Sequence, residues 1–247
     1  MRNLNNFGAI ILAAGKGKRM NSTTVNKVTL LLGGKPMIVH TIELLEKLGV
    51  KRIIVVVGFK KDSVIKLLNG RVIFSDQKKR LGTAHAAYCG MKKVSDDVEN
   101  IIILNGDDSA FYKIGALEEL IEKHFKTNAD FTFLTIEMIN PSGLGRIVRS
   151  AQGRLISVVE EKDATPEVLK INEINPACYV FKVEFLKKYL PKIKKSSKTG
   201  EYYLTSLIDL GIKNNKKVET LQAGHFVWRG VNTKDELNEA EKLWRRF

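Results

Sequence analysis

The sequence predicts an α/β fold with a mostly parallel mixed sheet flanked by helices and with extra antiparallel strands in the second half. In the first half, short apolar runs alternate with amphipathic stretches, which is the pattern of β-α-β units. These runs are continuous, as expected of parallel strands buried on both faces. In the second half, strand-like segments follow one another across short turns, which favours antiparallel pairing. With 247 residues and 44% hydrophobic content, the chain is long enough to bury a core of its own.

The elements of the first half can be placed from apolar periodicity. The apolar run from Ala9 to Ala13 is predicted to be the first strand. From Pro36 to Leu48, apolar residues recur at three- and four-residue spacing, which predicts a helix that ends at Gly49. The remaining predictions are a strand at 52–57, a helix at 62–68, a strand at 71–75, a helix at 83–94, a strand at 100–104 and a helix at 114–126.

The second half is predicted to begin with strands and to end with a helix. Turn residues occur at Pro141 to Gly143 and at Ala151 to Gly153. The segment from Lys234 to Trp244 has an apolar side and is predicted to be an amphipathic helix. No repeat, linker or clear domain boundary interrupts the chain, so we expect a single domain. The predicted strands are 131–138, 146–149, 155–160 and 173–181.

The apolar runs and the cysteines exclude several classes of protein. The longest runs, such as Ile53 to Val57, are far too short to span a bilayer, and the N-terminal region lacks the apolar core of a signal peptide. We therefore expect a cytoplasmic protein without membrane insertion. Cys89 and Cys178 have no further Cys or His at ligand spacing, so we expect two buried thiols rather than a zinc site or a disulfide framework.

The charge balance favours an anionic partner. The chain has 41 basic and 27 acidic residues, a net charge of +14, which suits any polyanion from a triphosphate to a nucleic acid. However, the lysines are spread along the whole chain without the interleaved aromatic residues that stack on bases. We therefore expect most of them to be solvated, and we expect no nucleic-acid partner.

The strongest local motif, LAAGKGKRM, runs from Leu12 to Met20 directly after the first predicted strand. Gly15 and Gly17 let backbone N–H groups point into one concavity, and the basic side chains add positive charge, so the loop suits a phosphate chain. The motif lacks the third glycine of a dinucleotide fingerprint and the G-K-[ST] ending of a P-loop. Taken alone, it is also compatible with a tight turn that carries solvated basic residues.

Two further positions could carry chemistry. Asp107 follows a predicted central strand, and the carboxyl ends of parallel strands are where open α/β sheets bind ligands. A carboxylate there suits Mg²⁺, although an Asp that caps a strand end fits the pattern equally well. Lys27 precedes an apolar run, where a single lysine is usually a surface residue. The residues by themselves therefore indicate a nucleotide-phosphate site on an α/β sheet and nothing more specific.

At these residues the sequence resembles the nucleotidyltransferases of the sugar-nucleotide pyrophosphorylase type, and within them the uridyltransferase domain of bacterial N-acetylglucosamine-1-phosphate uridyltransferase. The family pattern L-A-A-G-x-G-x-R-M followed by a lysine matches Leu12 to Met20 and Lys27. Each further motif is weak alone, but their order and spacing hold over nearly the whole chain. They are Gln77 with 81–86, Gly106-Asp107, 143–148, 160–164, 173–175, 201–205 and 230–233.

The resemblance implies a Rossmann-like nucleotidyltransferase fold and a Mg²⁺-dependent enzyme. It implies a nucleotide-binding half at about 1–127, a sugar-binding half at about 128–232 and a C-terminal helix at about 233–247. The implied reaction transfers a uridylyl group from UTP to a sugar-1-phosphate, with N-acetylglucosamine-1-phosphate as the expected acceptor. The chain ends at Phe247, so neither acetyl transfer nor the trimer that the relatives build through a β-helix is expected.

The same resemblance implies roles for individual residues. Arg19 and Lys27 would be catalytic and would hold the phosphates, and Asp107 and Asn232 would coordinate Mg²⁺. The residues implied to bind the nucleotide are Leu12, Ala13, Ala14, Gly15, Gln77, Gly82 and Thr83. Those implied to bind the sugar are Gly145, Glu160 and Asn175.

The sequence departs from the family pattern at several of these motifs. Asn26 stands where the family has proline before the lysine, and Asp108-Ser109 replaces the end of G-D-x-P. Pro176-Ala177 follows Asn175 where the family has Thr or Ser and then Gly, and Arg80 stands where glutamine is common. Two alternatives therefore stay open: a nucleotidyltransferase for another pair, such as glucose-1-phosphate, and a non-catalytic regulatory module that binds nucleotide sugars.

Overall fold

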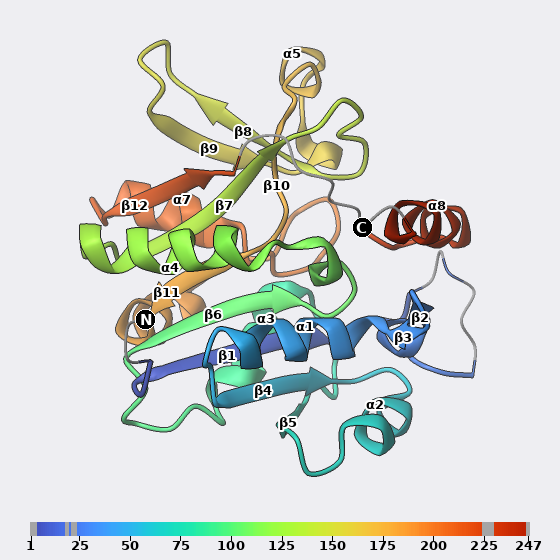
Figure 1. The fold of residues 1–247 in the computed structure, drawn as a ribbon. Helices are drawn as coiled ribbons and strands as arrows, with labels where there is room; N and C mark the ends of the chain where they lie inside the picture. Colours follow the sequence, from blue (N-terminus) through green and yellow to red (C-terminus); the bar gives the residue numbers. More distant parts are fainter. Residues whose placement is uncertain (1–3, 18–19, 21–23, 224–229, 246–247) are drawn as a thin grey trace.

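A central sheet with helices on both faces organises the protein (Figure 1). The computed structural model describes residues 4–17, 20, 24–223 and 230–245. The sheet strands are β1 (Phe7–Ala13), β4 (Arg52–Val57), β5 (Ile73–Asp76), β6 (Asn100–Asn105), β7 (Phe131–Glu137), β8 (Gly145–Arg149), β9 (Leu155–Val159), β10 (Glu173–Asn175), β11 (Tyr179–Lys182) and β12 (Val218–Gln222). The helices are α1 (Met37–Lys47), α2 (Lys61–Leu68), α3 (Thr83–Met91), α4 (Ile114–Thr127), α5 (Pro166–Leu169), α6 (Val183–Tyr189), α7 (Ser206–Lys213) and α8 (Lys234–Trp244).

The strand order confirms the predicted mixed α/β sheet. The strands lie in the order β5-β4-β1-β6-β11-β7-β10-β8-β9, with β12 beside β7. All pairs among β5, β4, β1 and β6 are parallel, whereas β11 runs antiparallel to β6 and β7, and β8 pairs antiparallel with β9 and β10. The strands of the first half therefore form a parallel core, to which the second half adds antiparallel strands and the strand β12, which runs parallel to β7.

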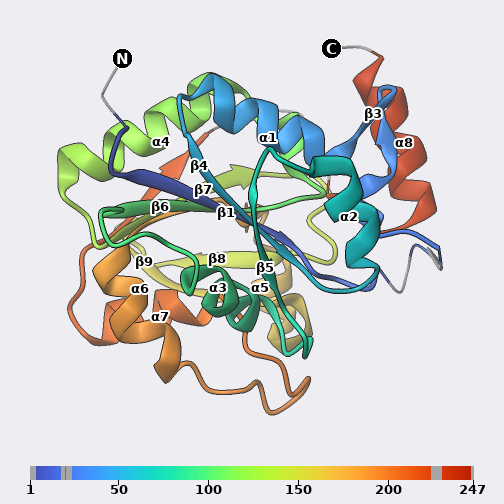
Figure 2. The ribbon, with the colours of Figure 1, turned by 90° about the horizontal axis from the view of Figure 1, so that it is seen from below.

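Successive side chains of β1 enter two separate cores. Ala9 and Ile11 pack with residues of α1 and α4, while Ile10 packs with residues of α3, α6 and α7. Figure 2 shows α1 and α4 on one face of the sheet and α3, α6 and α7 on the other. The strand is thus buried on both faces, as its continuous apolar sequence predicts.

Most predicted elements are confirmed within a few residues, and β4 and α8 have the predicted bounds. The single strand predicted at 173–181 is wrong. It divides into β10 and β11, because Pro176 has no N–H to donate and Ala177 adopts a left-handed conformation with φ of 61°. The prediction that every strand is buried on both faces is wrong for β5, which lies at the sheet edge and leaves Ile73 48% exposed. The helix predicted at 83–94 ends at Met91.

A small hairpin anchors the C-terminal helix to the first half of the chain. Strands β2 (Leu31–Leu32) and β3 (Lys35–Pro36) are joined by Gly33 and Gly34, both with positive φ. Trp244 of α8 covers Gly33 so closely that a β-carbon there would lie 1.8 Å from the indole nitrogen. The Trp244 ring also lies 4.5 Å from the His40 ring of α1. These contacts hold the last turn of α8 against the hairpin and α1.

Both cysteines are buried free thiols, as predicted. Within the described ranges, the helices are too short or too polar to cross a membrane.

Candidate functional site

Two adjoining hollows lie along the carboxyl ends of β1, β6 and β10. The larger, of about 870 Å³, is lined by residues of the glycine loop, by Lys27 and by the predicted nucleotide-binding and metal-binding residues. The smaller, of about 220 Å³, is lined by the predicted sugar-binding residues. The two share Leu12, Thr83 and Asn105 on their walls. The structure therefore brings together, in one continuous region, motifs that are scattered over the whole sequence.

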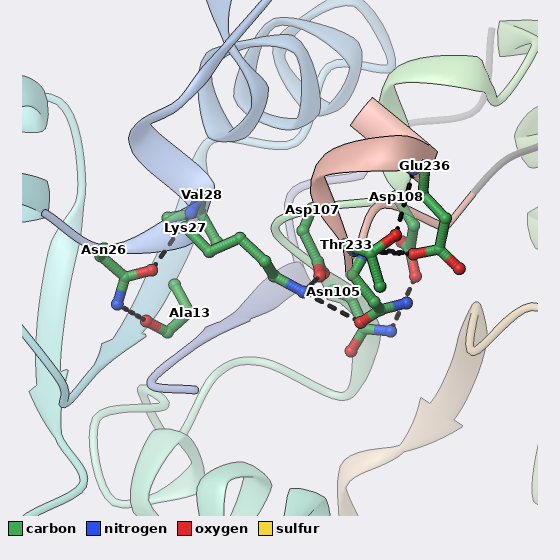
Figure 3. Close-up of polar contacts among 10 residues, drawn as sticks. Ala13, Asn26, Lys27, Val28, Asn105, Asp107, Asp108, Thr233 and Glu236 are labelled. Atoms are coloured by element: carbon green, nitrogen blue, oxygen red, sulfur yellow. Dashed lines mark hydrogen bonds and ion pairs between the residues drawn. The ribbon is translucent and has the colours of Figure 1, made fainter. Parts of the chain in front are cut away.

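Lys27 and Asp107 meet on the wall of the larger hollow (Figure 3), and Asn232 contacts Lys27 there. The ammonium group of Lys27 forms an ion pair with the Asp107 carboxylate and donates a hydrogen bond of 3.0 Å to Oδ1 of Asn232. The Lys27 and Asp107 side chains are only 11% and 15% exposed. The interpretation of Lys27 as an ordinary surface lysine is therefore wrong. The three residues come from the 3-10 helix Lys27–Thr29, the loop after β6 and the segment before α8.

The first turn of α8 fixes the backbone of Asn232. Oε2 of Glu236 accepts hydrogen bonds from the N–H groups of Asn232 and Thr233, at 2.6 and 2.9 Å. In return, Oγ1 of Thr233 accepts from the N–H of Glu236 at 3.1 Å. This capping box satisfies donors that would otherwise be unpaired at the helix start. It also holds the Asn232 side chain towards Lys27.

The oxygens of Asp107 and Asn232 fit a hard divalent cation. Both already face one positive charge, the Lys27 ammonium, and carboxylate and amide oxygens are ligands that Mg²⁺ accepts. No cluster of three or more His, Cys, Asp or Glu occurs in the described part of the chain, so a metal at this place would share its shell with water or phosphate oxygens. The neighbouring Asp108 is 6% exposed and accepts a hydrogen bond of 2.9 Å from Asn105. Asp108 thus has a partner of its own within the loop.

The glycine loop packs directly against Lys27. Gly17 has φ of 58°, and a β-carbon there would lie 3.2 Å from the β-carbon of Lys27. Leu12, Ala13, Ala14 and Gly15, for which nucleotide binding stays a prediction, line the larger hollow. The predicted catalytic residue Arg19 lies outside the described residues.

The predicted base-reading residues form one compact corner. Nε2 of Gln77 donates to the carbonyl of Gly82 at 3.1 Å and lies 3.0 Å from Nδ1 of His85, whose pKa is lowered chiefly by burial. Thr83 Oγ1 accepts from the N–H of Leu204 at 2.9 Å. Gly82 adopts φ of 105° and lies against the backbone of Tyr202. The segment around Tyr202 and Leu204 therefore shapes this corner, which the local sequence alone did not indicate.

The smaller hollow is lined by a half-buried acid, Glu160, and a buried phenol, Tyr179. Oε1 of Glu160 accepts a hydrogen bond of 2.9 Å from Thr205, and burial raises the pKa of its carboxyl group. Nδ2 of Asn175 donates to the hydroxyl of Tyr179 at 2.6 Å, and burial raises the pKa of that phenol. The N–H of Ala177 donates to Oδ1 of Asn175 at 3.0 Å. Gly145 lines the same hollow, whereas the part played by Tyr179 was not predicted from the sequence.

Comparison with known proteins confirms the resemblance. A family model described as "Nucleotidyl transferase" matches residues 8–245. The chain is 45% identical over 240 residues to "Bifunctional protein GlmU" of Carboxydothermus hydrogenoformans, covering 96% of this chain and 53% of that protein. It is 43% identical over 236 residues to the GlmU of Caldicellulosiruptor saccharolyticus, covering 94% and 50%. The chain thus spans about half the length of these curated relatives.

A solved structure confirms the fold independently. It comes from Bacillus anthracis and carries a provisional assignment as a glucose-1-phosphate thymidylyltransferase. The two chains superpose with a TM-score of 0.83, covering 98% of this chain and 96% of the other. At 20% identity, this similarity concerns the fold alone.

Proposed function

Because the chain belongs to the nucleotidyl transferase family, we propose that it transfers a uridylyl group from UTP to a sugar-1-phosphate, with N-acetylglucosamine-1-phosphate as acceptor and pyrophosphate as the second product. The observation that carries the proposal is the convergence of Lys27, Asp107 and Asn232 on the wall of the larger hollow, which shares wall residues with the smaller one. The similarity to GlmU over nearly the whole chain supports the choice of substrates. The cytoplasm is the compartment that we propose for this reaction.

In the proposed reaction, an oxygen of the sugar phosphate attacks the α-phosphorus of UTP. The bond from that phosphorus to the oxygen bridging the α- and β-phosphates breaks, and its electron pair leaves with pyrophosphate. Lys27 would stabilise the charge that develops on the α-phosphoryl oxygens, which is the electrostatic contribution usual in phosphoryl-type transfer. The N–H groups of the glycine loop, together with Arg19, would bind the triphosphate. Mg²⁺ held by Asp107 and Asn232 would neutralise phosphate charge.

The two hollows would orient the two substrates for in-line attack. In the larger one, Gln77, Gly82 and Thr83 would bind the base. In the smaller one, Gly145, Glu160 and Asn175 would bind the sugar. Placing both reactants beside Lys27 removes much of the entropic barrier to a two-substrate reaction.

Pyrophosphate release tests the proposal. Purified protein with Mg²⁺ is assayed with UTP, CTP, dTTP and GTP against sugar-1-phosphates that include N-acetylglucosamine-1-phosphate and glucose-1-phosphate. We expect release only when both substrates are present, with the first sugar and UTP as the preferred pair. A nucleotide-sugar ligand that binds without any turnover across the panel would contradict the proposal and favour a regulatory module.

Matched variants test the named residues. Lys27→Ala and Asp107→Asn are each expected to lower kcat by about 10²-fold, the scale of one lost transition-state contact. Asp108→Asn changes the neighbouring carboxylate and keeps an acceptor for Asn105, so it serves as the control and should stay within about threefold of wild type, about 0.6 kcal/mol. Equal losses in Asp107→Asn and Asp108→Asn would show that this loop matters for stability and not for metal binding.

A further inference from the structure

Asn26 is almost fully buried although it precedes Lys27 in a polar segment. The residue is 1% exposed and has the extended backbone of a helix N-cap, with φ of −72° and ψ of 141°. Its Oδ1 accepts a hydrogen bond of 3.1 Å from the N–H of Val28. A buried amide of this kind destabilises the folded protein unless its polar atoms form hydrogen bonds. Those of Asn26 are paired, and with more than one segment.

The Asn26 amide joins three separate parts of the site. Its Nδ2 donates to the carbonyl of Ala13 at 2.9 Å, where β1 ends and the glycine loop begins (Figure 3). The same nitrogen donates to the carbonyl of Phe59 at 2.6 Å, in the loop between β4 and α2. The backbone N–H of Asn26 also donates to Oγ of Ser63, at 3.0 Å. The side chain thus ties the glycine loop and the β4–α2 loop to the residue next to Lys27.

The packing around this junction leaves little room for adjustment. The N–H of Phe59 donates to the carbonyl of Ala14 at 3.2 Å, and a β-carbon added to Gly58 would lie 2.9 Å from Ala14. The side chain of Lys27 in turn packs against Gly17. A shift of the 3-10 helix that begins at Lys27 would therefore move the ammonium group relative to both Asp107 and the phosphate loop.

We propose that Asn26 is a positioning residue that holds Lys27 against Asp107 and Asn232 by tying the start of the 3-10 helix to the glycine loop. The proposal rests on the proposed function, since it assigns to Asn26 the placement of the lysine used there. Asn26 itself contacts no reacting atom in this assignment. Its effect on turnover is transmitted through Lys27.

A double-mutant cycle separates this role from a contribution to stability alone. Asn26→Ala is expected to lower kcat by about tenfold or more, because a displacement of about 1 Å can cost 10²-fold. In the Lys27→Ala background the same change should lower kcat by less than about threefold, since residues that act as a unit are not additive. Multiplicative losses in the cycle would overturn the proposal.

The matched control is Asn100→Ala at the opposite end of the sheet. Asn100 is also buried, and its Oδ1 lies 3.1 Å from Nε2 of the buried His124. Asn100→Ala should lower Tm by about as much as Asn26→Ala does. Its kcat, measured well below the Tm of both variants, should stay within about threefold of wild type. A parallel loss of kcat in Asn100→Ala would reduce Asn26 to an ordinary stabilising residue.

Two further measurements keep the proposal testable if Asn26→Ala folds poorly or if the proposed substrates are wrong. Ser63→Ala removes the acceptor of the Asn26 N–H, together with the hydrogen bond of 2.8 Å that the Ser63 hydroxyl donates to the Lys60 carbonyl. We expect a smaller loss of kcat than in Asn26→Ala, and we expect it to disappear again in the Lys27→Ala background. Amide hydrogen exchange needs no substrate. Exchange of residues 27–30 should be at least about tenfold faster in Asn26→Ala than in wild type, with α4 unchanged. Unchanged exchange at 27–30 would contradict the proposal that Asn26 holds the start of this 3-10 helix in place. Faster exchange in a protein that turns over no substrate pair would contradict only the proposed function.

Discussion

Substitution of Gly82 by alanine tests how the base-reading corner is built. Gly82 has φ of 105°, a backbone conformation that is essentially restricted to glycine. A β-carbon there would lie 2.5 Å from the carbonyl oxygen and 2.8 Å from the nitrogen of Tyr202, both of them backbone atoms. The two segments would have to separate by roughly 1 Å before that carbon reached an ordinary van der Waals distance.

The expected destabilisation follows from these distances. The backbone conformation costs about 1–3 kcal/mol for a residue other than glycine, and the forced contact about 1–3 kcal/mol more. Separation also strains the hydrogen bonds that Tyr202 makes, through its N–H with Leu81 at 2.8 Å and through its carbonyl with Ala84 at 2.9 Å. The lower entropy of the unfolded alanine chain returns about 0.4–1 kcal/mol. Together these contributions give an expected loss of about 1–5.5 kcal/mol for Gly82→Ala, with a central value of about 3 kcal/mol.

Thermal and urea unfolding followed by circular dichroism measure this loss. For a chain of this size, the central value of about 3 kcal/mol corresponds to a drop in Tm of roughly 6–12 °C. The control is Gly115→Ala in α4, where a β-carbon meets nothing within 4 Å and alanine favours the helix. A Gly82→Ala variant within about 1 kcal/mol of wild type would refute this account of the corner.

Three further substitutions are predicted from the same structure. Glu160→Gln should raise Tm at pH 7, because burial raises the folded-state pKa of Glu160 and the wild type therefore loses stability as the pH rises through that pKa. The difference in Tm between variant and wild type should vanish well below the ordinary pKa of 4.5, and a difference that does not depend on pH would contradict this prediction. Ala177→Gly should raise the free energy of unfolding, measured in urea, by up to about 1 kcal/mol, because the strain of the left-handed conformation that is relieved exceeds the conformational entropy that glycine loses on folding. A clear loss of stability would show instead that the Ala177 methyl group packs favourably. Trp244→Ala should lower the free energy of unfolding by about 3 kcal/mol or more, because it removes the contacts of α8 with Gly33 and His40. If α8 positions Asn232, kcat should fall as well; full activity at low temperature would show that these contacts do not affect the site.

Local patterns in the sequence were sufficient for the elements with strong periodicity. The continuous apolar run of β4 and the one-sided apolar pattern of α8 gave the observed bounds. The short helices α6 and α7 and the half-buried strand β12 were not predicted, because segments of five to eight residues hold too few periods to identify. The division between β10 and β11 was missed because the strand-like pattern continues beyond Pro176 and Ala177. The left-handed conformation of Ala177 and the change of pairing partner from β8 to β6 show it.

The site depended on information of longer range. The glycine loop and Asp107 follow predicted strands, so their position at the carboxyl edge could be reasoned from topology. The contact between Lys27 and Asn232 joins residues far apart in sequence; the family resemblance implied that both belong to the site, but it did not predict their contact. Asn26 appeared as a departure from a family proline, and only its tertiary hydrogen bonds led to the role that we propose for it.

Binding of Mn²⁺ in the presence of UTP, followed by electron paramagnetic resonance, tests the central claim most directly. Mn²⁺ takes the same oxygen ligands as Mg²⁺ and reports occupancy without turnover. The account predicts that Asp107→Asn and Asn232→Ala each weaken Mn²⁺ binding by about tenfold or more, whereas Asp108→Asn leaves it unchanged. Equal Mn²⁺ affinity in the wild type and in the Asp107 and Asn232 variants would contradict the assignment of this site as the metal centre.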